Sequence, residues 1–262
     1  MRFKDSLFAR SFKKINRHVL HIMMYDLLNI VFIALGFLLW IKILGNKAQQ
    51  LGIIDMNSLI YASQAELSQN LALIKGFVIA FFVLTVLFIV YLILVWSFFS
   101  LCVWCKILRK KLTEEYYVKF LLLNVAMAII GIPVFLFIAY LIAIAVSFVT
   151  PENIGGYLIR VYVLMIYFIA AFSLVQIVYY YFTEKPKIKS IVNALSAALK
   201  KKMAVSYIAA ASVFFVLSYI SNLMVVILPD RIAVFIDIIL ILLYLAWLRI
   251  YIVGCVGKMK KR

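Results

Sequence analysis

The sequence predicts an all-α protein: a polytopic transmembrane helical bundle of six spans, with amphipathic interfacial helices on the cytoplasmic side. Hydrophobic residues make up 68% of the 262 residues and charged residues only 14%, which is more apolar surface than a soluble domain of this size can bury. The apolar residues are gathered into long segments, and most basic residues lie in the short connections between them. We therefore expect a single membrane domain over residues 1–262.

Each apolar segment is long enough to cross a bilayer as a helix, which takes about 20 residues for a hydrocarbon core of about 30 Å. The segments lie near residues 22–45, 73–105, 119–149, 157–183, 203–228 and 232–256. They are continuously apolar, as in residues 77–96, whereas strands of a membrane barrel alternate. The third segment contains Gly131-Ile132-Pro133, and we expect the helix to kink there because proline removes a backbone hydrogen bond.

Lysine and arginine residues are concentrated in every second connection. They precede the first segment, separate the second from the third and the fourth from the fifth, and follow the sixth. Short loops rich in these residues stay on the cytoplasmic side during insertion. The sequence therefore predicts a multi-pass protein of the cell membrane with both termini in the cytoplasm. Three hairpin units, 1–105, 106–183 and 184–262, are one interpretation, although any six-span protein with both termini inside divides in this way.

Two of the basic connections carry an apolar stripe at helical spacing. The stripe in the amino-terminal segment consists of Phe8, Phe12, Ile15 and Val19. The stripe between the fourth and fifth segments consists of Ile188, Ile191, Val192, Leu195 and Leu199. The basic residues beside or after these stripes are Arg10, Lys13, Lys14, Arg17, Lys189, Lys200, Lys201 and Lys202. Helices of this kind lie in the head-group layer, although packing against other helices would produce the same stripes.

The net charge of +17 restricts the expected partners. Nucleic acid is not expected, because the basic residues occupy the places that topology alone requires. Each one near the membrane surface attracts anionic lipid by about 1 kcal/mol. The expected partners are therefore membrane lipids, preferentially anionic ones on the cytoplasmic face, together with a membrane or cytosolic partner subunit or a second copy of the chain.

Four ionisable residues are candidates for a site inside the membrane: Asp26, Arg160, Asp237 and Arg249. Asp237 and Arg249 are twelve residues apart on one helix, or about 18 Å, so they cannot pair with each other. By depth, Arg160 could meet Asp237, and either Asp26 or Glu184 could meet Arg249. Such residues form a polar path, a proton-coupled site or structural ion pairs, and Arg249 could also reach the interface by itself.

One motif resembles an enzyme site. Glu114-Glu115-x-x-x-Lys119 is similar to the paired-glutamate motif E-E-x-x-x-R of CAAX-type intramembrane proteases. Those enzymes also need histidines on later spans, whereas His18 and His21 precede the motif here. No catalytic, cofactor-binding or metal site is predicted, no cofactor is expected, and the protein is expected not to be an enzyme.

Two resemblances bear on function. The run from Lys187 to Leu223 resembles a pattern common in uncharacterised six-span prokaryotic integral membrane proteins, which implies a location and little more. The whole arrangement is similar to ABC-2 type exporter permeases, in which a helix between spans two and three docks on an ATPase; Lys110 to Lys119 would take that place. The re-entrant helices of that family have no room here, because only Pro229-Asp230-Arg231 joins spans five and six.

The sequence thus favours a non-enzymatic scaffold or subunit that organises lipid or partner proteins. The alternative is a transporter or an ABC-2-like permease component that moves a substrate across the membrane.

Overall fold

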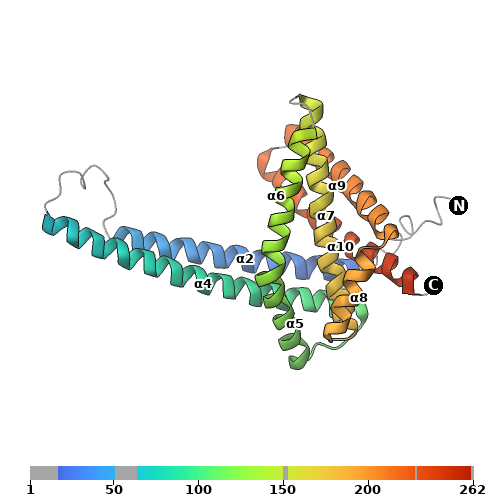
Figure 1. The fold of residues 1–262 in the computed structure, drawn as a ribbon, viewed down its shortest axis with the longest axis horizontal. Helices are drawn as coiled ribbons and strands as arrows, with labels where there is room; N and C mark the ends of the chain where they lie inside the picture. Colours follow the sequence, from blue (N-terminus) through green and yellow to red (C-terminus); the bar gives the residue numbers. More distant parts are fainter. Residues whose placement is uncertain (1–16, 51–63, 150–152, 228, 261–262) are drawn as a thin grey trace. The chain divides into compact units, whose positions relative to one another are not determined.

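The computed structural model of the protein describes residues 17–50, 64–149, 153–227 and 229–260, and these residues form helices and no strand (Figure 1). The helices are α2 (Arg17–Gln50), α4 (Gln64–Leu108), α5 (Glu114–Ala126), α6 (Ile132–Val149), α7 (Ile154–Glu184), α8 (Ile188–Ala198), α9 (Lys201–Ile227) and α10 (Asp230–Lys260). A π-helical turn, η2 (Met127–Gly131), joins α5 to α6.

Six stretches within these residues are long and apolar enough to span a membrane: Val19–Gln49, Lys75–Leu108, Glu114–Val149, Gly155–Glu184, Lys201–Met224 and Ile232–Gly257. The predicted all-α class with six spans is thereby confirmed. The chain is a multi-pass membrane protein, and large apolar side chains are exposed along its spans, where lipid is the solvent.

The contacts divide the chain into two compact units, Leu28–Phe98 on the one hand and Met1–Leu27 with Phe99–Arg262 on the other. The boundaries fall inside α2 and α4 rather than in the connections. The three hairpin units 1–105, 106–183 and 184–262 stay a prediction.

The unit Leu28–Phe98 is a hairpin of α2 and α4, which run beside each other (Figure 1). Aromatic rings join the two helices, with the Trp40 and Phe88 centroids 5.6 Å apart. The Tyr91 hydroxyl donates to the Phe32 carbonyl at 2.7 Å. A Cβ atom at Gly36 would lie 2.2 Å from Cε1 of Tyr91, so the missing side chain at this position lets the helices approach.

The second unit is built around α7, which contacts α5, α6, α8, α9 and α10 (Figure 1). Its core contains the fully buried side chains of Trp104, Phe120, Ile177 and Leu248. The Phe120 ring packs 4.7 Å from the ring of Tyr179, centroid to centroid. α7 is therefore the helix through which most of this unit is connected.

At Gly131-Ile132-Pro133, where the sequence predicts a kink, the structure has the π-helical turn η2, which ends at Gly131. The Ile132 N–H donates to the Met127 carbonyl, five residues earlier, which is the hydrogen bond of a π-helix. Pro133 follows immediately and supplies no N–H of its own. The wider turn is the local adjustment that lets one span continue through a proline.

Candidate functional site

α8 is held between α7 and α9 by side-chain hydrogen bonds at both ends. In its first turn, the Ser190 hydroxyl donates to the carbonyl of Lys185, the C-cap of α7, at 2.6 Å. After its last turn, the Tyr207 hydroxyl of α9 donates to the Ala198 carbonyl at 3.0 Å. These bonds satisfy backbone groups that a helix end leaves open, and they fix the rotation of α8 about its axis.

Three different faces run along α8. The face against the bundle consists of small buried residues, Ser190, Ala194, Ala197 and Ala198. A second face consists of Ile188, Val192, Leu195 and Leu199, which are 42% to 87% exposed. At about 100° per residue these four lie within an arc of about 60°. Exposed Lys189 lies about 90° from the centre of that arc, on the third face. Exposed Lys200 follows α8 in the turn, and exposed Lys201 and Lys202 begin α9.

The predicted apolar stripe at residues 188–199 is therefore present, but the protein packs α8 through other residues. Only Ile191 of the stripe is half-buried against the core. The four remaining members face away from the described part of the bundle. Packing within this chain thus accounts for Ile191 and not for the rest of the stripe.

The amino-terminal stripe falls mostly outside the described residues, as do Arg10, Lys13 and Lys14. α2 begins at Arg17, whose side chain is also outside the description. Val19 is buried with Ile22 in a small cluster that includes Val103 and Ala246. The last member of this stripe therefore packs against protein.

The unit formed by Met1–Leu27 and Phe99–Arg262 holds a buried ion pair between Asp26 of α2 and Arg249 of α10. Nη1 of Arg249 donates to the Asp26 carboxylate, and its Nε donates to Oε1 of Gln176 on α7 at 3.1 Å. Asp26 is 6% exposed, Arg249 3% and Gln176 1%. Of the two partners proposed for Arg249, the structure selects Asp26. Mutual neutralisation makes two charges tolerable in an apolar interior, and three helices are tied together as a result.

Arg160 and Asp237 have different partners in the contacts described. The Ser221 hydroxyl on α9 donates to Oδ1 of Asp237 on α10 at 2.6 Å. Nη2 of Arg160 on α7 donates to the Ser147 carbonyl on α6 at 3.4 Å. Each polar group is met by the neighbouring helix of its own hairpin, and the proposed pairing of Arg160 with Asp237 is not among these contacts.

Lys110 is an important residue that the sequence did not single out. α4 ends in a Schellman motif: Arg109 has φ 54°, and the Lys110 N–H donates to the Cys105 carbonyl at 2.9 Å. The Lys110 ammonium then donates to the carbonyls of Thr183 and Glu184, at 2.8 and 2.6 Å, and to the Tyr116 hydroxyl at 3.1 Å. A cation at the carboxyl end of α7 satisfies open carbonyls and the helix dipole.

The docking helix implied by the resemblance to ABC-2 permeases is not found at Lys110 to Lys119. Within the described stretch 64–149, residues 109–113 connect α4 to α5 without a helix of their own, and Glu114 already begins the third span. Lys110 itself is occupied at the end of α7.

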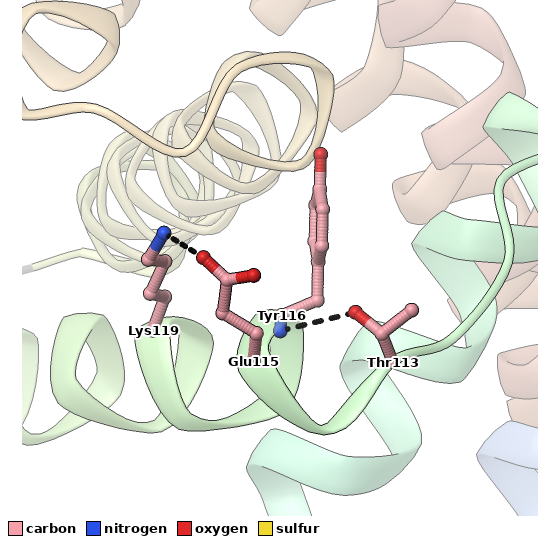
Figure 2. Close-up of polar contacts among 4 residues, drawn as sticks. All are labelled: Thr113, Glu115, Tyr116 and Lys119. Atoms are coloured by element: carbon pink, nitrogen blue, oxygen red, sulfur yellow. Dashed lines mark hydrogen bonds and ion pairs between the residues drawn. The ribbon is translucent and has the colours of Figure 1, made fainter.

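The paired glutamates open α5, and both are exposed. Figure 2 shows Glu115 with its neighbours Thr113, Tyr116 and Lys119. The Thr113 hydroxyl accepts from the Tyr116 N–H at 3.4 Å as an N-cap, and Glu115 pairs with Lys119 at 2.5 Å, one turn later. The Glu115 and Lys119 side chains are 75% and 44% exposed. Among the residues described, no three His, Cys, Asp or Glu side chains gather as a metal site would require. Glu115 thus supports the helix start and contributes little stability.

No protein-family model, no curated protein and no solved structure matches this chain. α8 and the Asp26–Arg249 pair are the two described features that bear on function.

Proposed function

We propose that the protein is a non-enzymatic scaffold or subunit of the cell membrane, with both termini in the cytoplasm, and that α8 gathers anionic lipid on the cytoplasmic face. One observation carries the proposal: α8 attaches to the bundle through small residues and exposes Ile188, Val192, Leu195 and Leu199 beside lysines. An apolar arc next to a basic arc is the pattern of a helix lying in the head-group layer.

The energetics favour a selective role for α8 over simple anchoring. Six spans already hold the chain in the bilayer, so α8 is not needed for attachment. Its apolar side chains place the helix at the boundary between head groups and acyl chains, where each lysine attracts anionic lipid by about 1 kcal/mol. The run Lys200, Lys201 and Lys202 then determines which lipids collect around this face.

The test uses the purified full chain in vesicles of mixed phosphatidylcholine and phosphatidylglycerol. Native mass spectrometry counts the phosphatidylglycerol molecules retained after gentle extraction. Changing Lys200, Lys201 and Lys202 together to Gln should lower the affinity for phosphatidylglycerol, so that fewer molecules are retained. Since each lysine contributes about 1 kcal/mol, the upper limit of the decrease is on the order of a hundredfold. The decrease should be smaller at high salt, which screens the charges.

A matched control removes the same charge elsewhere. Lys42, Lys47 and Lys75 are also exposed and lie at the ends of α2 and α4 away from the basic connections. Changing these three to Gln should lower retention by less than the change at Lys200, Lys201 and Lys202, because the apolar arc of α8 does not lie beside them in the sequence. Equal loss in both triple variants would show that total charge matters and α8 does not, and no loss in either would refute the proposal.

The transporter is the second candidate function, and the buried Asp26–Arg249 pair is the observation that favours it, because ionisable groups inside a membrane commonly mark a transport path. Proton flux into vesicles under an imposed pH gradient, followed with an enclosed pH-sensitive dye, provides the test. Arg249→Gln should abolish flux at unchanged abundance, and Arg160→Gln should not. Lost abundance without a specific flux defect would favour a structural pair.

A further inference from the structure

A polar stripe follows one face of α7. It consists of Ser173, Gln176, Tyr180 and Thr183, which are 0% to 8% exposed. Their spacing of three, four and three residues places them within an arc of about 80°, over about 15 Å of helix. The stripe runs from the interior of the unit to the carboxyl end of α7 at Glu184.

Most polar atoms along this stripe have no partner among the described residues. Oγ of Ser173, Nε2 of Gln176 and Oγ1 of Thr183 are buried without a hydrogen bond. So is Nε1 of Trp104, whose ring packs edge-on against Tyr180 with centroids 6.1 Å apart. A buried polar group without a hydrogen bond costs about 1–3 kcal/mol of stability. Three such groups along one face of α7, with the Trp104 indole beside Tyr180, indicate that a polar ligand satisfies them.

Ser173 differs from other serines on the helices of this unit. Ser206 and Ser212 donate to the carbonyl four residues earlier on their own helix, at 3.1 and 3.0 Å. That bond is the usual way in which a serine in a membrane helix satisfies its hydroxyl. The Ser173 hydroxyl does not use it and is available to a ligand.

Charged groups meet the stripe at two places. At Gln176, one turn from Ser173, Oε1 accepts from Arg249, which is paired with Asp26. At the carboxyl end of α7, the half-buried Lys110 ammonium donates to the backbone carbonyl of Thr183. The stripe thus runs from the end of a helix past a buried ion pair to Ser173.

We propose that water enters at the Glu184 end of α7 and follows this stripe past the Asp26–Arg249 pair to Ser173. Buried water with two to four polar partners commonly satisfies groups of this kind. Such a file of water would connect the Asp26 carboxylate with the aqueous phase on one side of the membrane only. The proposal is independent of lipid binding by α8.

Cysteine accessibility tests this path in the full chain in lipid vesicles. Cys102, Cys105 and Cys255 are first changed to Ala, and single cysteines are then introduced by Ser173→Cys and Thr183→Cys. The control is Ile177→Cys, because Ile177 is apolar, fully buried and adjacent to Gln176. The reagent is the water-soluble methanethiosulfonate-ethylammonium, and intact mass follows its addition.

Cysteines at 173 and 183 should react at least about tenfold faster than one at 177, because the reactive thiolate forms where water reaches it. Equally slow reaction at all three positions, in variants with an unchanged melting temperature, would overturn the proposal. Where the cysteine variants do not fold, Ser173→Ala in the otherwise unchanged chain decides. If the Ser173 hydroxyl is bound to water, Ser173→Ala should leave the melting temperature unchanged or lower it. A higher melting temperature would show that the hydroxyl has no hydrogen-bond partner in the wild-type chain, and would overturn the proposal.

Discussion

Asp26→Asn removes the negative charge that balances Arg249, with almost no change in side-chain volume. Both residues are buried, at 6% and 3% exposure, so bulk solvent at the protein surface does not screen the remaining charge. The guanidinium would keep its charge, with Oε1 of Gln176 as its other described acceptor. Breaking a buried pair in this way costs about 3–5 kcal/mol. That is a large part of the total stability of about 5–15 kcal/mol typical of a folded protein.

A double-mutant cycle gives the sharpest measurement. The free energy of unfolding is measured by denaturant titration in mixed micelles for Asp26→Asn, Arg249→Met and the double variant. Each single change should cost about 3–5 kcal/mol, and the double variant less than their sum, because replacing both partners leaves no unpaired buried charge. Glu115→Gln, in the exposed pair with Lys119, is the control and should cost no more than about 0.5 kcal/mol. Equal costs for Asp26→Asn and Glu115→Gln, or strict additivity in the cycle, would refute the buried pair.

Three further substitutions test local features. Arg109→Gly should stabilise the chain by about 1 kcal/mol, measured by thermal unfolding. The reason is that residue 109 has φ 54°, a backbone conformation in which only glycine is unstrained. The control, Lys111→Gly, should give no such gain. Lys110→Met should lower the free energy of unfolding by about 1–2 kcal/mol and speed amide hydrogen exchange at the end of α7, since the Thr183 and Glu184 carbonyls lose their donor. Unchanged exchange would argue against the cap. Gly36→Ala should cost about 1–3 kcal/mol in thermal unfolding, because the new Cβ displaces the Tyr91 ring; Gly45→Ala, with open space around the Cβ, should not destabilise the chain.

The spans were predictable because lipid imposes a local rule. A segment without water must satisfy its own backbone hydrogen bonds, so a long apolar run in the sequence is already a helix in the structure. A local adjustment of the helix near Pro133 was predictable for the same reason, since the missing N–H is a property of one residue, but its π-helical form was not. Periodicity also indicated α8, although the buried face was a different one from the predicted apolar stripe.

A signal for that buried face was present in the sequence. Ala194, Ala197 and Ala198 have the three- and four-residue spacing of one helix face, and small residues let helices in membranes pack closely. Large apolar residues are a poor guide to the protein interior in a chain whose solvent is lipid. Here they occur both in the core and on the exposed surface, and at α8 it is the small residues that identify the contact.

The helical class, the six membrane-spanning segments and the two candidate acidic partners for Arg249 follow from local patterns, because hydropathy and depth are properties of a segment and its neighbours in the chain. Long-range packing selects the actual contacts: Asp26 and Gln176 meet Arg249, Ser221 meets Asp237, and Lys110 binds the end of α7. These contacts join residues from 16 to 223 positions apart. Which helices become neighbours, and which faces they turn to each other, depends on packing across the whole bundle, and no local pattern contains that information.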